Sequence, residues 1–328
     1  MSMRVAILDD YQDAARGLAC FARLAAHEVE TFRDTLTEVD AIARRLEGFD
    51  AVVAIRERTR FTRALIERLP PRLKLISLTG PLSGHVDMAA AGERGITVCQ
   101  GRGSGASAPE LTWALVLAAT RHVALEDRRL REGRWQTTIG RVLDGLTLGI
   151  LGYGRIGAKV AGYGRAFGMT VLVHGREGSR ERAARDGHAL AGSQAELFER
   201  SDVLSIHLSM NDGTRGAVRA DDLARMKPDA LLVNTARAGL IEPGALLAAL
   251  RAGRPGMAAL DVFDVEPLPA DDPLLALDRV LLSPHLGYVT RDGYEVLFGD
   301  AFDNLLAYAA GRPTNVIAPP GAQGETRA

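Results

Sequence analysis

The chain has 328 residues, the length of about two domains. Hydrophobic residues make up 47% and charged residues 25%, a composition that can bury substantial cores and that excludes a disordered or a fibrous protein. The 40 basic side chains are balanced by 41 acidic ones. The resulting net charge of −1 argues against a nucleic-acid-binding protein that relies on a basic face.

The cysteines and the N-terminal residues predict a soluble protein of the cytoplasm. Cys20 and Cys99 lie too far apart in sequence for a zinc-binding pair and indicate no disulfide framework, so we expect a reducing compartment and no metal site. The chain starts with acids where a signal peptide needs an apolar run. The longest apolar stretch, residues 111–119, is too short to cross a bilayer, so we expect no membrane association.

The first hundred residues alternate between strand and helix patterns. Four aliphatic runs predict strands: residues 4–8, 51–55, 73–78 and 96–100. Between the first two runs, residues 35–47 have helical spacing and open with a capping box formed by Thr35 and Glu38. Strands and helices in alternation predict a parallel sheet with helices on its faces.

A glycine-rich segment, GRGSGASAP at 101–109, interrupts this pattern and precedes a predicted helix from Glu110 to about Arg131. Such a segment is typical of a linker between domains and equally of a loop that approaches a ligand, and the two interpretations are compatible.

A second and more regular series of strands and helices follows. Its aliphatic runs predict strands at residues 147–151, 170–174, 203–207, 230–234, 256–262 and 279–283. A capping box at Ser193 and Glu196 predicts the start of one helix, and residues 292–311 predict a last one. The series predicts a doubly wound α/β domain.

A dinucleotide fingerprint lies at the start of this second series. Residues 152–157 read GYGRIG, with Gly152, Gly154 and Gly157 in the GxGxxG pattern, directly after a strand and directly before a helix. The remaining residues of this predicted phosphate loop are Tyr153, Arg155 and Ile156. The glycines permit a tight turn, close approach to a pyrophosphate, and packing of helix on strand.

The end of the next strand bears on the choice between NAD and NADP. If the strand ends at His174, Gly175 occupies the position where NAD enzymes have an acid, and Arg176 is placed to meet a 2′-phosphate. If the turn is longer, Glu177 is the acid that bonds the ribose of NAD. Both cofactors, NAD and NADP, remain open, and Arg176 favours NADP by a small margin.

Several motifs in order resemble the D-2-hydroxyacid dehydrogenases, the family of phosphoglycerate dehydrogenase and glyoxylate/hydroxypyruvate reductase. These motifs are HVDMAAAGERGI at 85–96, REGRW at 131–135, SDVLSIHLSMNDGTRGAV at 201–218, MKPDALLVNTARAGL at 226–240, ALDVFDVEP at 259–267 and SPHLGYVT at 283–290. The resemblance implies a Rossmann cofactor domain, residues 102–288, inserted into a flavodoxin-like substrate domain, residues 1–101 plus 289–328. It also implies a homodimer joined through the cofactor domains.

The resemblance assigns catalysis to Arg237, Glu266 and His285, each of which follows a predicted strand. His285 would be the general acid in reduction and the base in oxidation. Glu266 would orient the imidazole and favour its protonated form, and Arg237 would bind the carboxylate and polarise the keto group.

Further family positions imply the rest of the site. The implied cofactor contacts, besides the fingerprint, are His207, Leu208, Ser209, Thr214, Thr235, Ala236, Asp261 and Gly287, with Asp261 holding the nicotinamide amide. Where the family offers backbone amides to the substrate carboxylate, this chain has Gly80, Pro81, Leu82 and Ser83. Because proline has no N–H, the carboxylate contact would shift to Leu82, Ser83 or the side chain of Arg56.

Two other features concern the substrate. Arg56, Arg58 and Arg60 alternate after a strand, where they are either anion-binding residues or a solvated face. Tyr288 replaces a small residue of the family and would narrow the pocket.

The sequence therefore predicts an NAD(P)-dependent oxidoreductase that moves a hydride between the cofactor and a small 2-keto or D-2-hydroxy acid of the glyoxylate, hydroxypyruvate or phosphoglycerate class. The alternative is a dinucleotide-sensing binding protein of corepressor type. The near-neutral net charge favours the enzyme.

Overall fold

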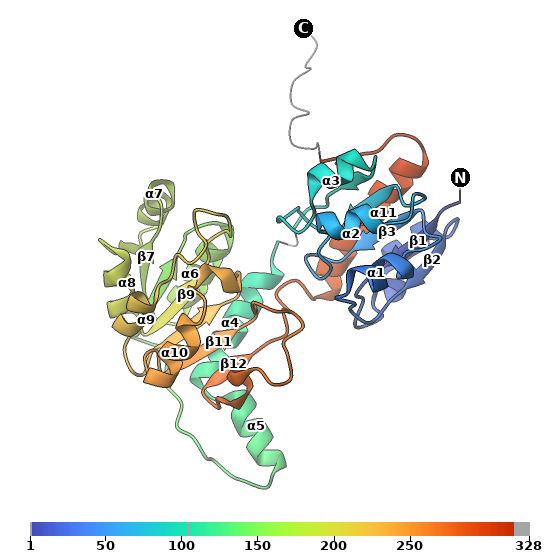
Figure 1. The fold of residues 1–328 in the computed structure, drawn as a ribbon. Helices are drawn as coiled ribbons and strands as arrows, with labels where there is room; N and C mark the ends of the chain where they lie inside the picture. Colours follow the sequence, from blue (N-terminus) through green and yellow to red (C-terminus); the bar gives the residue numbers. More distant parts are fainter. Residues whose placement is uncertain (1, 104, 318–328) are drawn as a thin grey trace. The chain divides into compact units, whose positions relative to one another are not determined.

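The computed structural model describes residues 2–103 and 105–317. The chain divides into two compact units, Met1–Gly105 with Val289–Ala328, and Ala106–Tyr288 (Figure 1). Ser104 of the predicted glycine-rich loop and residues 318–328 of the predicted substrate domain lie outside the described residues.

The first unit is built on a five-stranded parallel sheet. Its strands are β1 (Arg4–Ile7), β2 (Glu28–Thr31), β3 (Ala51–Ala54), β4 (Leu75–Leu78) and β5 (Thr97–Cys99). Their order across the sheet is β2-β1-β3-β4-β5, which is the flavodoxin-like arrangement expected from the sequence. Strand β2 was not predicted, because its residues alternate between half-buried and exposed positions at the sheet edge.

Helices cover both faces of this sheet. Helices α1 (Val39–Arg45), α2 (Arg63–Arg68) and α3 (Met88–Glu93) share one core with alternate residues of β1, β3, β4 and β5. The last helix, α11 (Arg291–Ala309), packs on β4 and on the 3₁₀ helix η2 (Ala19–Leu24), near the 3₁₀ turn η1 (Ala15–Gly17). Phe298 and Phe302 of α11 are fully buried, and each contributes about 1.5–3 kcal/mol by leaving water. The C-terminal helix thus completes the domain in which the chain begins.

The predicted capping box of α1 is wrong. The helix begins at Val39 with Glu38 as its N-cap, and no side chain caps it. The hydroxyl of Thr35 instead donates to the buried carboxylate of Asp9 at 2.8 Å.

The second unit is built on a seven-stranded parallel sheet. Its strands are β6 (Thr147–Leu151), β7 (Thr170–His174), β8 (Ala189–Leu190), β9 (Val203–Ile206), β10 (Leu231–Asn234), β11 (Met257–Leu260) and β12 (Val280–Leu282). Their order is β12-β11-β10-β9-β6-β7-β8, the doubly wound Rossmann pattern. The winding reverses between β6 and β9, so the carboxyl ends of these two strands form the expected ligand position.

The helices of the second unit also lie on both faces of the sheet. Helices α4 (Ser107–Thr120) and α6 (Arg155–Ala166) share one core, and α8 (Gln194–Arg200), α9 (Ala220–Arg225) and α10 (Ala245–Ala252) share the other. Helix α7 (Glu177–Arg185) and the 3₁₀ turns η3 (Ala238–Leu240) and η4 (Pro273–Ala276) complete the unit. The hydroxyl of Ser193 accepts a hydrogen bond from the Glu196 N–H at 3.1 Å, which confirms the Ser193 half of the predicted capping box of α8. The Glu196 carboxylate accepts the Gly192 N–H at 2.7 Å instead of the Ser193 N–H.

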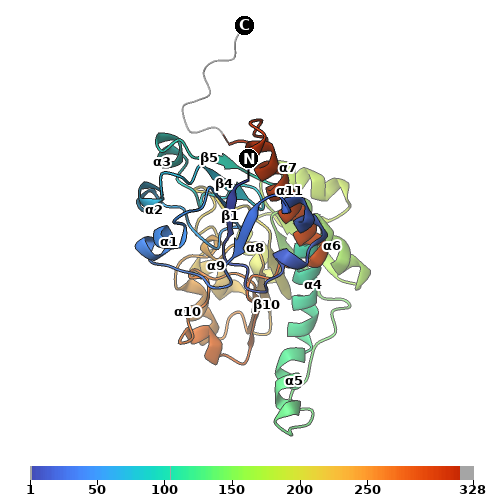
Figure 2. The ribbon, with the colours of Figure 1, turned by 90° about the vertical axis from the view of Figure 1, so that its right-hand side faces the viewer.

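The predicted helix from Glu110 to Arg131 is in fact two helices. Helix α4 ends at Thr120, and α5 (Val123–Arg131) begins after His122, whose backbone is left-handed with φ +53°. Helix α5 extends away from the sheet of its unit (Figure 2).

Candidate active site

The three glycines of the fingerprint lie in three different steric environments. Gly152 has φ +93°, and a Cβ atom there would lie 2.9 Å from the carbonyl oxygen of His207, at the end of β9. A Cβ atom on Gly157 would collide with the carbonyl oxygen of Gly152, so only glycine lets α6 approach the turn. A Cβ atom on Gly154 would meet open space.

This arrangement fits a dinucleotide. Gly154 is the N-cap of α6, a helix of 12 residues, and it provides no side chain to satisfy the first N–H groups. Gly154 and Arg155 are exposed, so a pyrophosphate can approach these N–H groups and the positive end of the helix dipole. Residues 152–157 would hold the phosphates.

Tyr153 is the buried member of the loop. Its hydroxyl donates to Asp186 at 2.7 Å, and Arg182 donates to its carbonyl oxygen at 3.0 Å. Burial and the Asp186 carboxylate raise the pKa of Tyr153, so the phenol stays protonated. These bonds tie the phosphate loop to α7.

The strand β7 ends at His174, as the NADP interpretation requires. Gly175 lies close to Gly152 and Ser179, since a Cβ atom on it would be 3.2 Å from the Ser179 Cβ and 3.6 Å from the Gly152 Cα. Arg176 is the N-cap of α7 and is exposed, and the equally exposed Glu177 is the first residue of that helix.

The ends of β9 and β10 hold most of the other predicted cofactor residues. Burial lowers the pKa of His207 to about 4, so its ring is neutral at neutral pH, and its Nε2 lies 2.9 Å from the hydroxyl of Ser205. Thr214 donates to the carbonyl oxygen of Ser209 at 2.7 Å and thereby shapes the loop that also includes Leu208. The hydroxyls of Thr235 and Thr112 of α4 lie 2.7 Å apart.

His285 and Glu266 form a close pair. The Nδ1 atom of His285 lies 2.6 Å from Oε2 of Glu266, and the other carboxylate oxygen accepts the Phe263 N–H at 2.9 Å. Since Nδ1 faces the carboxylate, Nε2 is the ring nitrogen left for a substrate. The ring of Tyr288 packs edge-on against the imidazole at 5.2 Å. Tyr288, which was predicted to narrow the substrate pocket, thus contacts His285, the predicted general acid.

Asp261 holds the loop that carries His285. Its Oδ1 accepts the Ser283 hydroxyl at 2.6 Å and the Leu286 N–H at 2.7 Å, and its Oδ2 accepts the Gly287 N–H at 2.9 Å. The side chain is fully buried, and this burial raises its pKa. Within the described residues both oxygens are thus engaged by the chain itself, so the geometry supports a positioning role for Asp261. Its contact with nicotinamide stays a prediction.

Arg237 lies on the same edge of the sheet, in the loop after β10. The buried Asn234 fixes this loop: its amide donates to the Arg237 carbonyl at 2.9 Å, and its carbonyl oxygen accepts the Ala236 N–H at 3.0 Å. Arg237, Asp261 and His285 therefore follow three adjacent strands, β10, β11 and β12. Asn234 was not predicted as a site residue. Its position at the end of β10, directly before the predicted cofactor residue Thr235, is a recognisable signal.

In the first unit, all three predicted carboxylate contacts already have partners within the chain. The Leu82 N–H donates to the side chain of Gln100 at 3.2 Å, and the Ser83 hydroxyl donates to Glu57. The guanidinium of Arg56 lies over Gly80, where any Cβ atom would collide with it. Nη2 of Arg56 also lies 3.5 Å from Oε1 of Glu57, so the carboxylate contact stays a prediction for all three residues.

The alternating arginines do not form a solvated face. Arg56 and Arg58 are half-buried, and only Arg60 is exposed. Arg58 donates to the Asp9 carbonyl oxygen at 2.6 Å and to the Tyr294 hydroxyl at 3.1 Å, and its guanidinium stacks 4.5 Å from the centre of the Tyr11 ring. Arg58 thus has a structural role within its unit.

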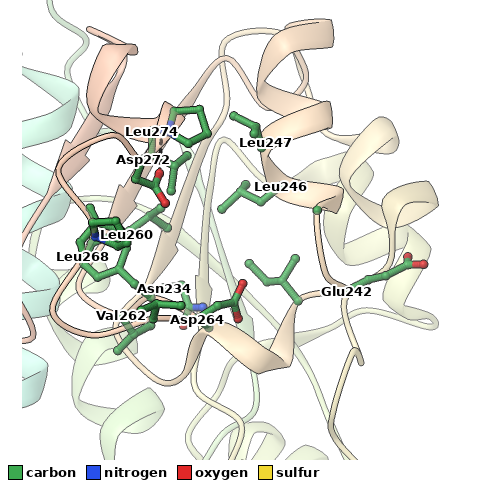
Figure 3. A pocket seen from close by; sticks show the side chains of 17 residues that line it. Asn234, Glu242, Leu246, Leu247, Leu260, Val262, Asp264, Leu268, Asp272 and Leu274 are labelled. Carbon is green, nitrogen blue, oxygen red and sulfur yellow. Dashed lines mark hydrogen bonds between the residues drawn. The ribbon is translucent and has the colours of Figure 1, made fainter. Parts of the chain in front are cut away.

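A cavity of about 240 Å³ lies beside the loop that carries Glu266. Figure 3 shows Leu246 and Leu247 of α10 on one side and Leu274 with Asp272 on another. Val265, directly before Glu266, also lines it.

Across residues 2–103 and 105–317, no group of three histidine, cysteine or acidic side chains is arranged to hold a metal ion. Over the same residues, no helix has the length and apolar character needed to span a membrane.

Comparison with known proteins identifies the family. The model of the D-isomer specific 2-hydroxyacid dehydrogenase, NAD binding domain, matches residues 113–287. A glyoxylate reductase of Aeropyrum pernix is 40% identical over 75% of this chain and 77% of its own. A D-3-phosphoglycerate dehydrogenase of Methanocaldococcus jannaschii is 38% identical over 74% of this chain and 46% of its own. The chain spans about half the length of the phosphoglycerate dehydrogenases it matches.

Solved structures agree with this result. An oxidoreductase of Ralstonia solanacearum superposes with a TM-score of 0.95 at 50% identity, covering 97% of each chain. These relatives are named as dehydrogenases, reductases or oxidoreductases, so the corepressor alternative is not supported. The chain belongs to the D-isomer specific 2-hydroxyacid dehydrogenase family and is an NAD(P)-linked oxidoreductase of 2-hydroxy acids.

Proposed function

We propose that the enzyme acts mainly as a reductase of small 2-keto acids of the glyoxylate, hydroxypyruvate or phosphoglycerate class, with His285 as its proton donor. The observation that carries this proposal is the 2.6 Å contact between His285 and Glu266 at the carboxyl edge of the sheet. General acids of this kind need a partner that fixes the ring and stabilises its charge, and Glu266 is itself held by the Phe263 N–H.

The dinucleotide supplies the hydride, and the residues of this chain supply the charges and the proton. Nε2 of His285 gives its proton to the oxygen of the keto group as the hydride arrives, and Glu266 orients the ring through Nδ1. Arg237, with its planar and always charged guanidinium, binds the substrate carboxylate and polarises the carbonyl. Asp261 keeps the His285 loop in place through its three hydrogen bonds.

The variant His285→Asn tests the proton donor. His285 has φ +53°, a conformation that asparagine tolerates better than most residues, so the loop should persist. Loss of the acid should lower kcat for glyoxylate or hydroxypyruvate reduction by about 10²- to 10⁴-fold. The Kd of the dinucleotide, measured by fluorescence titration, should change little.

His122 offers a matched control, because it has the same φ of +53° at the α4–α5 junction. His122→Asn should retain wild-type kcat. Wild-type turnover in His285→Asn would remove the proposed role, and equal losses in both variants would indicate a general structural effect.

We also propose that the enzyme prefers NADP. This is supported by the end of β7 at His174, the glycine that follows and the exposed guanidinium of Arg176. Arg176→Gln should weaken NADPH binding about tenfold or more and leave NADH binding nearly unchanged, in titrations of each cofactor. Glu177→Gln is the paired variant. A wild-type enzyme that strongly prefers NADH, and loses that preference in Glu177→Gln, would contradict the assignment.

We propose that the enzyme forms a homodimer and that it works in the cytoplasm. Trp135 and Ile139, in the segment after α5, are 76% and 94% exposed, which is typical of surfaces that bind another protein. The buried free thiols of Cys20 and Cys99 suit a reducing compartment.

Sedimentation should give about twice the chain mass of 35.1 kDa. Ile139→Asp should shift the mass toward that of one chain, and Leu275→Asp, at an exposed apolar residue of η4, should not. A monomeric wild-type enzyme would contradict the proposal.

A further inference from the structure

A buried hydroxyl of helix α4 contacts a predicted cofactor residue. Thr112 is fully buried, and its Oγ1 lies 2.7 Å from Oγ1 of Thr235, the residue that follows β10. Helix α4 packs on β10 and β11, so this contact joins the helix to the loop that leads to Arg237. Thr112 was not predicted as a site residue.

A second contact of Thr112 fixes the direction of this hydrogen bond. Its Oγ1 also lies 2.8 Å from the carbonyl oxygen of Ala108, one turn earlier in α4. A carbonyl oxygen has no proton, so Thr112 donates in this short contact. A hydroxyl has only one proton, so the proton between the two threonines belongs to Thr235. Thr235 therefore donates to Thr112, and its oxygen is left with acceptor capacity only.

Thr235 matters because of what flanks it along the sheet edge. The fingerprint follows β6, and Arg237 and the loop of His285 follow β10 and β12. If the pyrophosphate lies on the fingerprint and the keto acid lies against Arg237 and His285, the nicotinamide lies between them, beside the ends of β9 and β10. The hydroxyl of Thr235, directly after β10, is then a contact for the amide on that ring.

We propose that Thr112 is a positioning residue for the cofactor, because it sets Thr235 as a hydrogen-bond acceptor for the amide N–H of nicotinamide. The inference rests on the proposed function, in which the dinucleotide binds along this edge. A carboxamide offers two N–H donors and one carbonyl oxygen. An acceptor-only Thr235 pairs with the N–H side and has no proton for the carbonyl side. It therefore favours one orientation of the carboxamide.

A dinucleotide with an acetyl group in place of the carboxamide is a matched probe. This acetylpyridine analogue keeps the carbonyl oxygen and lacks the N–H groups. The wild-type enzyme should bind the reduced nicotinamide dinucleotide at least about threefold more tightly than the reduced analogue, because a hydrogen bond between uncharged groups has about this effect. Calorimetric titration gives the two Kd values, and their ratio measures the preference.

Two variants break the proposed hydrogen bond from its two sides. Thr112→Val removes the acceptor and keeps the branched shape. The Thr235 proton can then turn toward the acetyl oxygen, so the preference for nicotinamide should fall at least about threefold. Thr235→Val removes the hydroxyl that meets the cofactor and should also lower the preference. The double variant should lower it no further than Thr235→Val alone, because Thr112 acts only through Thr235.

Two controls separate the hydrogen bond from the packing of α4. Thr120, near the end of the same helix, is also buried and donates to the Val116 carbonyl at 2.8 Å, as Thr112 donates to Ala108. Thr120→Val should therefore keep the preference. Thr112→Ser retains the hydroxyl and should keep it too. A preference that falls as far in Thr120→Val as in Thr112→Val would assign the effect to helix packing and overturn the inference.

The remaining outcomes are equally decisive. A wild-type enzyme that binds the two dinucleotides equally, or a preference unchanged in a folded Thr112→Val, overturns the inference and leaves the proposed function standing. If Thr112→Val does not fold, an unchanged preference in Thr235→Val overturns it instead. A wild-type enzyme that binds neither dinucleotide contradicts the proposed function and, with it, the inference.

Discussion

The buried carboxylate of Asp261 is the constraint on which the candidate active site depends. It lies directly after β11, and its hydrogen bonds to Ser283, Leu286 and Gly287 hold the loop after β12. His285, inside that loop, has a left-handed backbone that a side chain of its size rarely adopts unless the surroundings impose it. Without the carboxylate, buried N–H groups would lose their acceptors at a cost of about 1–3 kcal/mol each. The position of the imidazole is therefore set by a residue 24 positions earlier in the chain.

Parallel topology explains why residues so distant in sequence act together. Each strand of the second unit delivers its last residues to one edge of the sheet, so the loops after β10, β11 and β12 bring Arg237, Glu266 and His285 to that edge. The fingerprint after β6 lies on the same edge, at the point where the winding reverses. The first unit repeats this logic with a different strand order and places Arg56 and Glu57 at its own switch point.

Much of this fold could be predicted from the sequence, because buried parallel strands are continuous aliphatic runs and the fingerprint has a fixed local context. The errors arose where tertiary contacts override local patterns. Thr35 has the spacing of a helix cap, but its hydroxyl donates to Asp9, which lies 26 positions earlier in the loop after β1. The break at His122 has no glycine or proline to announce it. Strands β2 and β8 lie at or beside sheet edges and lack a continuous apolar run.

Prediction of the candidate site from the sequence had the same limit as prediction of the fold. The spacing of Arg237, Glu266 and His285 could be matched to a family, and the structure adds the contact between two of them. The support that Asp261 gives to the His285 loop depends on which loops meet in space. Local spacing contains no information on contacts between residues 22 to 26 positions apart, so this support could not be predicted.

The central claim is that the contact with Glu266 fixes the imidazole of His285 as the proton donor for reduction. The kcat for keto-acid reduction in Glu266→Gln tests this claim most directly, with the Kd of the dinucleotide as the control. Without the carboxylate the ring loses the partner that orients it, so kcat should fall about tenfold or more while the Kd changes little. A wild-type kcat in a folded Glu266→Gln enzyme would contradict the account.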